Sequence, residues 1–328
     1  MKYQSVLSLL ETEVAIKFVK DVFERELAAA LDLTRVSAPL FVLPETGLND
    51  NLNGYERTVK FEIKAAGKEA EIVQSLAKWK RAALKKYGFG AETGLYTDMN
   101  AIRRDEDLDY IHSVYVDQWD WERILTKEER NEEYLKETVK KIYRAFRVTA
   151  DKVAEKYPAL KRELPEEVYF VGTEELEKRW PSLTRKERED RIAREKKAVF
   201  LMHIGWDLAD GKPHDGRAAD YDDWNLNGDI LLYNERADKA FEISSMGIRV
   251  DKDSLIKQLE KRGELNKLEN PFCKGVVSGE LPLTVGGGIG QSRLCMYLLK
   301  KAHIGEVQSS VWTEEEYARC EEAGIRLL

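Results

Sequence analysis

The sequence predicts an α+β fold in which helices flank an antiparallel β-sheet. Apolar, strand-like segments come in adjacent pairs around polar turns, at residues 94–104 with 111–122 and within residues 229–242, and such pairs form hairpins. Helical segments do not alternate with single strands, as they would in a doubly wound parallel sheet. We therefore expect one domain over residues 1–328, to which residues 157–197 could add a helical appendage.

The individual elements follow from the spacing of apolar residues. Within residues 11–31 a buried stripe repeats at helical spacing, and Thr12 is a suitable N-cap. This stripe comprises Ile16, Val19, Phe23 and Leu27. In order, the other expected elements are strands at 35–43 and 57–63, a helix at 71–87, the hairpin at 94–122, a long charged helix at 131–156, a short strand and two charged helices within 166–197, a buried strand at 198–206, the hairpin at 229–242, and helices at 252–261, 267–273 and 292–302.

The composition limits the classes of function. Hydrophobic residues make up 43% and charged residues 34% of the chain, and the net charge is −7, which argues against a protein whose main role is to bind nucleic acid. The three cysteines have no paired or metal-binding spacing and are expected to be reduced thiols. No signal peptide and no apolar run of about 18 residues is present. We expect a cytoplasmic protein without a nucleic-acid or membrane partner.

Asp229 and Glu242 flank the second hairpin. If its turn is centred between Glu235 and Arg236, the two carboxylates face each other, and they repel unless a cation lies between them. Oxygen ligands of this kind suit Mg²⁺, which shares its coordination shell with water and substrate phosphates. The alternative is a pair of solvated acids on a surface hairpin.

The first hairpin carries a second polar group. A register with Arg103 opposite His112 also places Thr97 opposite Gln118. Because side chains alternate between faces, Arg103, Gln118 and Asp120 then share one face, and Trp119 and Trp121 belong to the core. A cation, an amide and a carboxylate on a rigid sheet suit a small-molecule site. A half-exposed strand is the alternative.

The glycine-rich run at 286–293 leads into an apolar helix. Glycines such as Gly288 let backbone approach a ligand closely, and the following helix N-terminus favours anions. Arg293, on the first turn of that helix, could bind a phosphate through its planar guanidinium. A glycine run alone is often only a loop, so the arginine carries most of this interpretation.

Lys80 lies on the buried stripe of the helix predicted at 71–87, whereas Lys78, Arg81 and Lys85 should form an outer basic face. A buried lysine needs an anionic partner, or its pKa falls. Lys80 could therefore neutralise a substrate carboxylate, or its amine could reach the helix edge.

Other reactive arrangements find little support in the sequence. The acidic loop at 214–224 contains His214. The chain has four histidines, but no second histidine lies at metal-ligand spacing, so we do not expect zinc. No nucleophile elbow or reactive Cys-His pair is present.

The polar segments together resemble a known family. Arg103 with its acidic loop and return strand resembles the second signature motif of class II aminoacyl-tRNA synthetases, residues 286–293 resemble the third, and residues 36–41 resemble the first, which is a dimer element. More specifically, the chain resembles the ammonia-dependent asparagine synthetases, or aspartate–ammonia ligases. This resemblance runs in order over segments 50–52, 75–81, 112–122, 220–224, 226–229, 242–249 and 286–293.

The resemblance implies a class II synthetase-like core, a homodimer, and the ATP-dependent synthesis of L-asparagine from L-aspartate and ammonia. The intermediate would be a β-aspartyl-adenylate, and AMP and pyrophosphate would be released. It implies catalytic roles for Asp50, Lys80, Arg103 and Gln118, with Asp50 taking a proton from ammonium. It implies substrate binding by Ser75, Asp120, Asp222, Ser245 and Arg249. It implies ATP binding by Arg103, Glu106, Arg217, Gly288 and Arg293, and Mg²⁺ binding by Asp229 and Glu242.

Three other functions fit the sequence less well. A tRNA synthetase for aspartate or asparagine would need an anticodon-binding domain, for which there is no room before residue 11. A regulatory subunit without catalysis should lose phosphate-binding arginines or metal-binding acids, yet these are present. A biotin-ligase-type enzyme would not need Asp120 near an amine. No glutamine-hydrolysing domain is evident, so free ammonia is the expected nitrogen donor.

Overall fold

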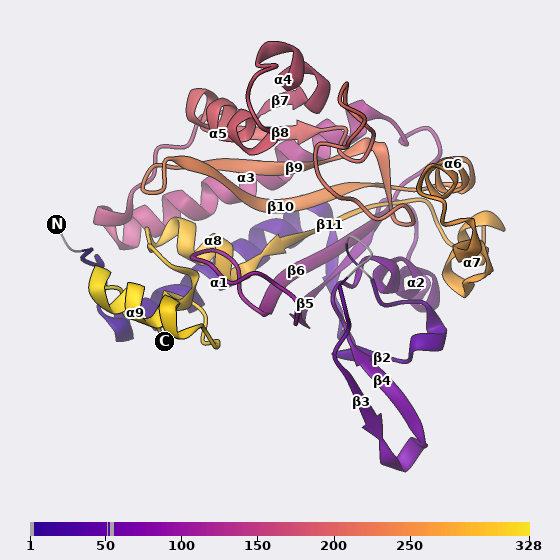
Figure 1. Ribbon diagram of the computed structural model, residues 1–328, viewed down its shortest axis with the longest axis horizontal. Helices are drawn as coiled ribbons and strands as arrows, with labels where there is room; N and C mark the ends of the chain where they lie inside the picture. The colour runs from indigo at the N-terminus through magenta and orange to yellow at the C-terminus, as the bar shows by residue number, and fades with distance from the viewer. Residues whose placement is uncertain (1–2, 51, 53–55) are drawn as a thin grey trace.

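The computed structural model describes residues 3–50, 52 and 56–328. Within these ranges the main sheet has eight strands in the order β1-β5-β6-β11-β10-β9-β8-β7 (Figure 1). The strands are β1 (Leu33–Arg35), β5 (Gly94–Ile102), β6 (Tyr115–Ile124), β7 (Tyr169–Gly172), β8 (Ala198–Met202), β9 (Asp222–Asn234), β10 (Lys239–Arg249) and β11 (Thr284–Gly290).

The sheet is mixed, so the prediction of an antiparallel sheet is wrong at both edges. In the spatial order β5-β6-β11-β10-β9-β8, each strand is antiparallel to its neighbours. At the edges, β1 pairs in parallel with β5, and β7 pairs in parallel with β8. The reason is the connections: α4 (Thr173–Arg179) and α5 (Arg185–Lys196) carry the chain from β7 back to the start of β8, and parallel pairing needs such a crossover. The segment expected to be an appendage therefore supplies an edge strand of the main sheet.

One face of the sheet packs on the main hydrophobic core. Helices α1 (Leu9–Leu31), α3 (Glu132–Lys156) and α8 (Gln291–Leu298) contribute to this core together with Trp119 and Trp121. The predicted stripe of α1 is buried, but Ser8, not Thr12, is its N-cap and forms a capping box with Glu11. Thr12 instead donates its hydroxyl to the Ser8 carbonyl oxygen at 2.7 Å.

The opposite face is covered at its two ends. Helix α2 (Ala77–Tyr87) packs against β5, β6 and β11, and α4 and α5 pack against β7 to β10. Helices α6 (Lys252–Arg262) and α7 (Pro271–Val277) lie beyond α2, and α9 (Glu314–Ala323), which was not predicted, lies near the N-terminus (Figure 1).

The helix predicted at 267–273 is replaced by a short 3₁₀ turn and α7. None of the helices in the described ranges is long and apolar enough to cross a membrane.

A small sheet projects from the body as an arm (Figure 1). Its strands are β2 (Phe41–Val42), β4 (Lys68–Ile72) and β3 (Lys60–Ile63), in that spatial order. The strand expected at 35–43 is interrupted around Pro39, and the helix expected from residue 71 begins only at Ala77 because β4 occupies the preceding residues.

Both hairpins differ in register from the prediction. In the first, Thr97 lies opposite Asp120 and Met99 opposite Gln118. The slip is two residues, so each side chain keeps its predicted face. In the second, the turn lies between Asn234 and Lys239. The register also shifts between Glu242 and Ser244, which is a β-bulge.

Candidate active site

The open stretch of the sheet between α2 and α4–α5 carries a cavity of about 420 Å³. A single cross-strand row of residues, which continues behind the cavity, forms part of its floor, and opposite residues in such a row point to the same face. In this row Asp120 lies opposite Gly288, Gly288 opposite Ser245, and Ser245 opposite Asp229. The row brings together four predicted site residues that are up to 168 positions apart in the chain, from 120 to 288.

Most of the predicted site residues line this cavity. They are Asp50, Ser75, Lys80, Arg103, Glu106, Gln118, Asp120, Arg217, Glu242, Ser245, Arg249, Gly288 and Arg293. Asp222 and Asp229 are the two that lie behind it, each paired with an arginine of the lining, Arg249 and Arg217 respectively. These two acids therefore influence the cavity by holding Arg249 and Arg217 in position.

Lys80 is fully buried and pairs with Asp120. Its amine also donates to the Gly287 carbonyl oxygen at 3.1 Å and lies 3.8 Å from the Glu122 carboxylate. Burial lowers the pKa of the Lys80 amine, although Asp120 and Glu122 oppose that shift. The amine does not reach the helix edge. Asp120 Oδ2 has no hydrogen-bond partner among the described residues, so this buried oxygen has an unused capacity to accept a hydrogen bond.

Arg249 organises the neighbouring part of the lining. It donates to Glu122 through Nε and, at 2.8 Å, through Nη2, and it contacts Asp222 through Nη1. Burial alone would raise the pKa of the Glu122 carboxyl, but Arg249 and Lys80 outweigh burial and lower that pKa. Burial raises the pKa of Asp222 despite its contact with Arg249. The guanidinium is thus held rigidly by two acids at the edge of the cavity.

The glycine run is a strand, β11, and not a loop. A Cβ on Gly286 would lie 1.9 Å from Glu122 Oε2 and 2.6 Å from Arg249 Nη2. A Cβ on Gly288 would lie 2.3 Å from Gln118 Oε1. These glycines therefore make room for polar side chains of the neighbouring strands, a reason that the sequence pattern did not indicate.

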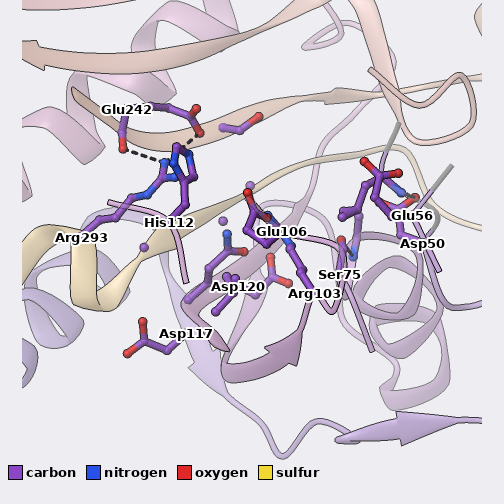
Figure 2. Close-up of a pocket in the computed structure, with 18 of the residues that line it drawn as sticks. Asp50, Glu56, Ser75, Arg103, Glu106, His112, Asp117, Asp120, Glu242 and Arg293 are labelled. Carbon is purple, nitrogen blue, oxygen red and sulfur yellow. Dashed lines mark hydrogen bonds and ion pairs between the residues drawn. The ribbon is translucent and has the colours of Figure 1, made fainter. Parts of the chain in front are cut away.

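Glu242, Arg293 and His112 gather at one end of the cavity, and Asp50, Glu56 and Ser75 lie at the other (Figure 2). Arg293 donates to the Glu242 carbonyl oxygen at 3.1 Å, and its Nη1 lies 3.7 Å from Glu242 Oε1. Within the part of the chain that the structure describes, Arg103 has two long contacts, of 3.4 and 3.5 Å, with the Gln74 carbonyl oxygen. Two arginines thus face the cavity with donors to spare, as a polyphosphate would require.

The two predicted metal ligands share a face of the sheet but are not opposite each other. Glu242 pairs with Leu231, and Asp229 pairs with Ser245. Burial and Glu242 raise the pKa of Asp229 to about 7, while Arg217, which bonds both Asp229 oxygens, opposes the shift. Glu242 keeps a 40% exposed side chain. Glu242 is thus suited to bind Mg²⁺ directly. Asp229 is suited to bind the ion only after Arg217 releases the Asp229 carboxylate.

Asp117, which sequence reasoning missed, anchors helix α8. Its Oδ1 accepts from the Ser292 backbone N–H at 3.0 Å, and its Oδ2 accepts from the Ser292 hydroxyl at 2.8 Å and from the Lys20 amine at 3.2 Å. A carboxylate at a helix N-terminus is stabilising. These contacts fix the turn that carries Arg293. Because Asp117 and Ser292 are 175 positions apart, no local pattern could reveal them.

Asp50 is 1% exposed and lies beside a buried ion pair. Its neighbours Lys78 and Asp220 are joined at 2.6 Å. Burial and Asp220 raise the pKa of Asp50 to about 6, and Lys78 opposes that shift. Asn51, which belongs to the segment 50–52 of the family resemblance, lies outside the described residues.

The predicted outer basic face of α2 is wrong for two of its three residues. Lys78 and Arg81 are buried, and only Lys85 is exposed. The reason is a second covering layer: Lys78 meets Asp220, and Arg81 donates to the Pro282 and Val250 carbonyl oxygens.

Two histidines lie in buried contacts away from the cavity lining. His214 pairs with Glu189 at 2.8 Å. His303 bonds Glu316 through Nε2 at 2.7 Å and accepts from the Gly305 N–H through Nδ1 at 2.9 Å. Glu316 and Cys320 lie close enough to His303 to suggest a metal site, but hydrogen bonds already occupy both of its ring nitrogens.

A sequence model of the aspartate–ammonia ligase family matches residues 10–324. The chain belongs to this family. An aspartate–ammonia ligase of Clostridium tetani is 62% identical over 328 residues, covering 100% of this chain and 96% of the relative. One from Ruminiclostridium cellulolyticum is 59% identical, covering 99% and 97%. The family resemblance inferred from the sequence is confirmed.

Solved structures place the fold among class II synthetases. An asparaginyl-tRNA synthetase of Entamoeba histolytica, in complex with asparaginyl-adenylate, aligns with a TM-score of 0.65 at 14% identity, over 93% of this chain and 68% of that one. The asparaginyl-tRNA synthetase of Pyrococcus horikoshii, complexed with the same adenylate, gives 0.63 at 16%, over 92% and 70%. The ligase thus has the class II catalytic-core fold that the sequence predicted.

Proposed function

We propose that this ligase condenses L-aspartate with ammonia through a β-aspartyl-adenylate, converting ATP to AMP and pyrophosphate. One observation carries the proposal: Arg103 and Arg293 face the same cavity as the unpartnered Oδ2 of Asp120. Cationic side chains suit a polyphosphate, and a buried carboxylate oxygen suits an amine. The family and the adenylates bound to the two structural neighbours support it.

In the first half-reaction, a β-carboxylate oxygen of aspartate attacks the α-phosphorus of ATP, and pyrophosphate leaves. Both reactants are anions, so positive charge must lie between them. We assign this charge to Arg103 and Arg293, with Arg217, Glu106 and the Gly288 backbone on the nucleotide side. Arg217 enters this role by exchanging its contact with Asp229 for phosphate.

The amino acid is held at the floor of the cavity. Asp120 accepts from the α-amine, and the contact with Lys80 holds the Asp120 side chain in place. Arg249, held by Asp222 and Glu122, points its remaining donors towards a substrate carboxylate. Gln118, Ser75 and Ser245 supply neutral hydrogen bonds in the same lining.

Magnesium would be held at the end of the cavity where Arg293 lies. Glu242 is the direct ligand that the geometry favours, and Asp229, on the same face of the sheet, is the second. A bound Mg²⁺ supplies positive charge that screens the polyphosphate.

In the second half-reaction, ammonium gives a proton to Asp50, and the ammonia formed attacks the β-carbonyl carbon of the adenylate. The bond from that carbon to the AMP oxygen breaks, AMP leaves with the electron pair, and the new amide loses its extra proton to solvent. An Asp50 pKa of about 6 keeps the carboxylate ionised at neutral pH yet basic enough to accept a proton.

We further propose a cytoplasmic homodimer that does not need nucleic acid. Helix α1 and the segment before it expose Val6, Leu9, Leu10 and Val14, and a group of exposed apolar side chains suits a protein interface. The three cysteines are buried thiols, which suits a reducing compartment.

Isotope transfer tests the adenylate. Aspartate labelled with oxygen-18 in the β-carboxylate is incubated with ATP, Mg²⁺ and ammonium, and AMP is analysed by mass spectrometry. Because the β-carboxylate oxygen becomes the bridge to phosphorus, each AMP formed from fully labelled substrate should carry one labelled oxygen. Aspartate labelled in the α-carboxylate is the control and should transfer none. Label in inorganic phosphate, with ADP as the other product, would contradict an adenylate.

A further inference from the structure

A second cavity, of about 430 Å³, adjoins the first. Asp50, Leu52, Arg217 and Ala218 line both cavities, so these residues mark the junction between them. The second cavity is also lined by the exposed Arg262 at the end of α6 and by Glu264, Lys267 and Asn270 in the segment that follows. Asp50 therefore lies between the first cavity and the second, which offers a separate approach to the active site.

Two buried carboxylates line this second cavity with unused oxygens. Asp50 and Asp220 are each 1% exposed. One oxygen of each has a partner: Asp50 Oδ1 accepts from the Leu52 N–H at 3.2 Å, and Asp220 Oδ2 lies 2.6 Å from the Lys78 amine. Among the described residues, Asp50 Oδ2 and Asp220 Oδ1 have none. A buried carboxylate oxygen without a donor is costly, so these two oxygens favour a bound donor.

The charge balance at this point also favours a cation. Asp50 and Asp220 bring two negative charges, and Lys78, which is 6% exposed, contributes one positive charge in contact with Asp220. Arg103 acts on Asp50 more weakly than Lys78 or Asp220 does, and Arg217 is paired with Asp229. The cluster thus retains one net negative charge, and a monovalent cation would neutralise it.

We propose that the second cavity is the path by which ammonium reaches the active site, and that Asp220 and Asp50 bind it there through their unpartnered oxygens. Ammonium carries a single positive charge and four N–H donors, so it has enough donors for both oxygens. This inference rests on the proposed function and adds to it a binding residue, Asp220, and a route separate from the one used by aspartate and ATP.

The substitution Asp220→Asn tests the binding residue. It keeps the size of the side chain but removes its charge. Because a hydrogen bond to a charged group contributes more than a neutral one, the KM for ammonium should rise by about ten-fold or more. Aspartate-dependent exchange of labelled pyrophosphate into ATP should stay within about two-fold of the unaltered enzyme, because adenylate formation does not use ammonium.

Two controls separate ammonium binding from a general effect on the cavity. Glu71→Gln makes the same change in an acid of the same lining whose carboxylate already meets Asn49 and Lys60, and it should leave the KM for ammonium unchanged. Hydroxylamine is a nucleophile that is neutral at about pH 8. In Asp220→Asn, the KM for hydroxylamine should rise much less than the KM for ammonium. An equal loss with both nucleophiles, or an unchanged ammonium KM, would overturn the proposal.

A second variant tests the route and does not depend on the stability of Asp220→Asn. Ala218 is partly exposed at the junction of the two cavities, and Ala218→Leu should narrow the passage. We expect the ammonium KM to rise several-fold while pyrophosphate exchange persists; an unchanged KM would exclude this route. If the unaltered enzyme made no asparagine, the proposed function itself would fail, which is a different result from an active enzyme that is insensitive to both substitutions.

Discussion

The buried pair of Glu122 and Arg249 offers a quantitative test of how the cavity is held together. Glu122 is fully buried and meets Arg249 Nη2 at 2.8 Å, the Thr284 hydroxyl at 2.6 Å and the Lys80 amine at 3.8 Å. The substitution Glu122→Gln preserves its shape but removes its charge. Arg249 and Lys80 are then left buried with less negative charge around them.

The size of the effect follows from these distances. At an effective dielectric constant of about 20, Arg249 and Lys80 attract Glu122 by about 6 and 4 kcal/mol before solvation is counted. The cost of desolvating the charges offsets much of this attraction, and breaking a buried pair by changing one partner costs about 3–5 kcal/mol. We therefore expect Glu122→Gln to lower the free energy of unfolding by about 3–5 kcal/mol at neutral pH.

The same pair predicts the sign of the pH dependence. The pKa of Glu122 is lower in the folded protein than its ordinary value of 4.5. A depressed carboxyl pKa stabilises the folded state fully above that ordinary value, and the contribution disappears as the pH falls through the folded pKa. The stability difference between the unaltered ligase and Glu122→Gln should thus be constant at neutral pH and shrink as the pH falls below 4.5.

Urea unfolding, followed by the fluorescence of the buried Trp119 and Trp121 beside Glu122 and by circular dichroism, measures the difference. The matched control is Glu269→Gln, whose side chain is 85% exposed, and its unfolding midpoint should not move. A loss below about 1 kcal/mol for Glu122→Gln, or a difference independent of pH down to strongly acidic conditions, would refute a stabilising role for the contacts of Glu122 with Arg249 and Lys80.

Three further predictions concern catalysis. Arg103→Ala and Arg293→Ala should each reduce aspartate-dependent pyrophosphate exchange by about 100-fold or more while leaving the circular dichroism spectrum unchanged; normal exchange in either variant would remove that residue from the phosphate site. Asp50→Ala should still exchange pyrophosphate but make no asparagine. In the unaltered enzyme, the rate of asparagine synthesis at saturating ammonium should fall below a pH of about 6, whereas pyrophosphate exchange should not. Equal loss of both half-reactions in Asp50→Ala would show that Asp50 has no specific role towards ammonia. Gly288→Ala should displace Gln118, whose Oε1 lies 2.3 Å from the new Cβ position, and raise the KM for aspartate more than the KM for ATP; a KM for aspartate equal to that of the unaltered enzyme would show that Gln118 does not contact it.

Periodicity in the sequence predicted faces better than it predicted registers. The alternation of Gln118 and Asp120 with Trp119 and Trp121 assigned each side chain to the correct side of β6, because a slip of two residues leaves the faces unchanged. The pairing itself depends on turn lengths and on the bulge next to Glu242, and neither has a clear local signal.

The environment of the charged residues was the main thing that the sequence could not reveal. The helical spacing of Lys78 and Arg81 is the same whether their face meets solvent or a second layer, and here it meets Asp220 and two backbone carbonyl groups. The position of Asp229 behind Arg217 and the anchoring of α8 by Asp117 likewise depend on contacts between segments that are distant in the chain.

Product analysis with aspartate, MgATP and ammonium chloride, with and without tRNA, is the most direct test of the proposed reaction. We expect asparagine, AMP and pyrophosphate in equal amounts, strictly dependent on ammonium and indifferent to tRNA. Pyrophosphate exchange without asparagine, or products that form only with tRNA, would contradict it and assign the cavity to aminoacylation.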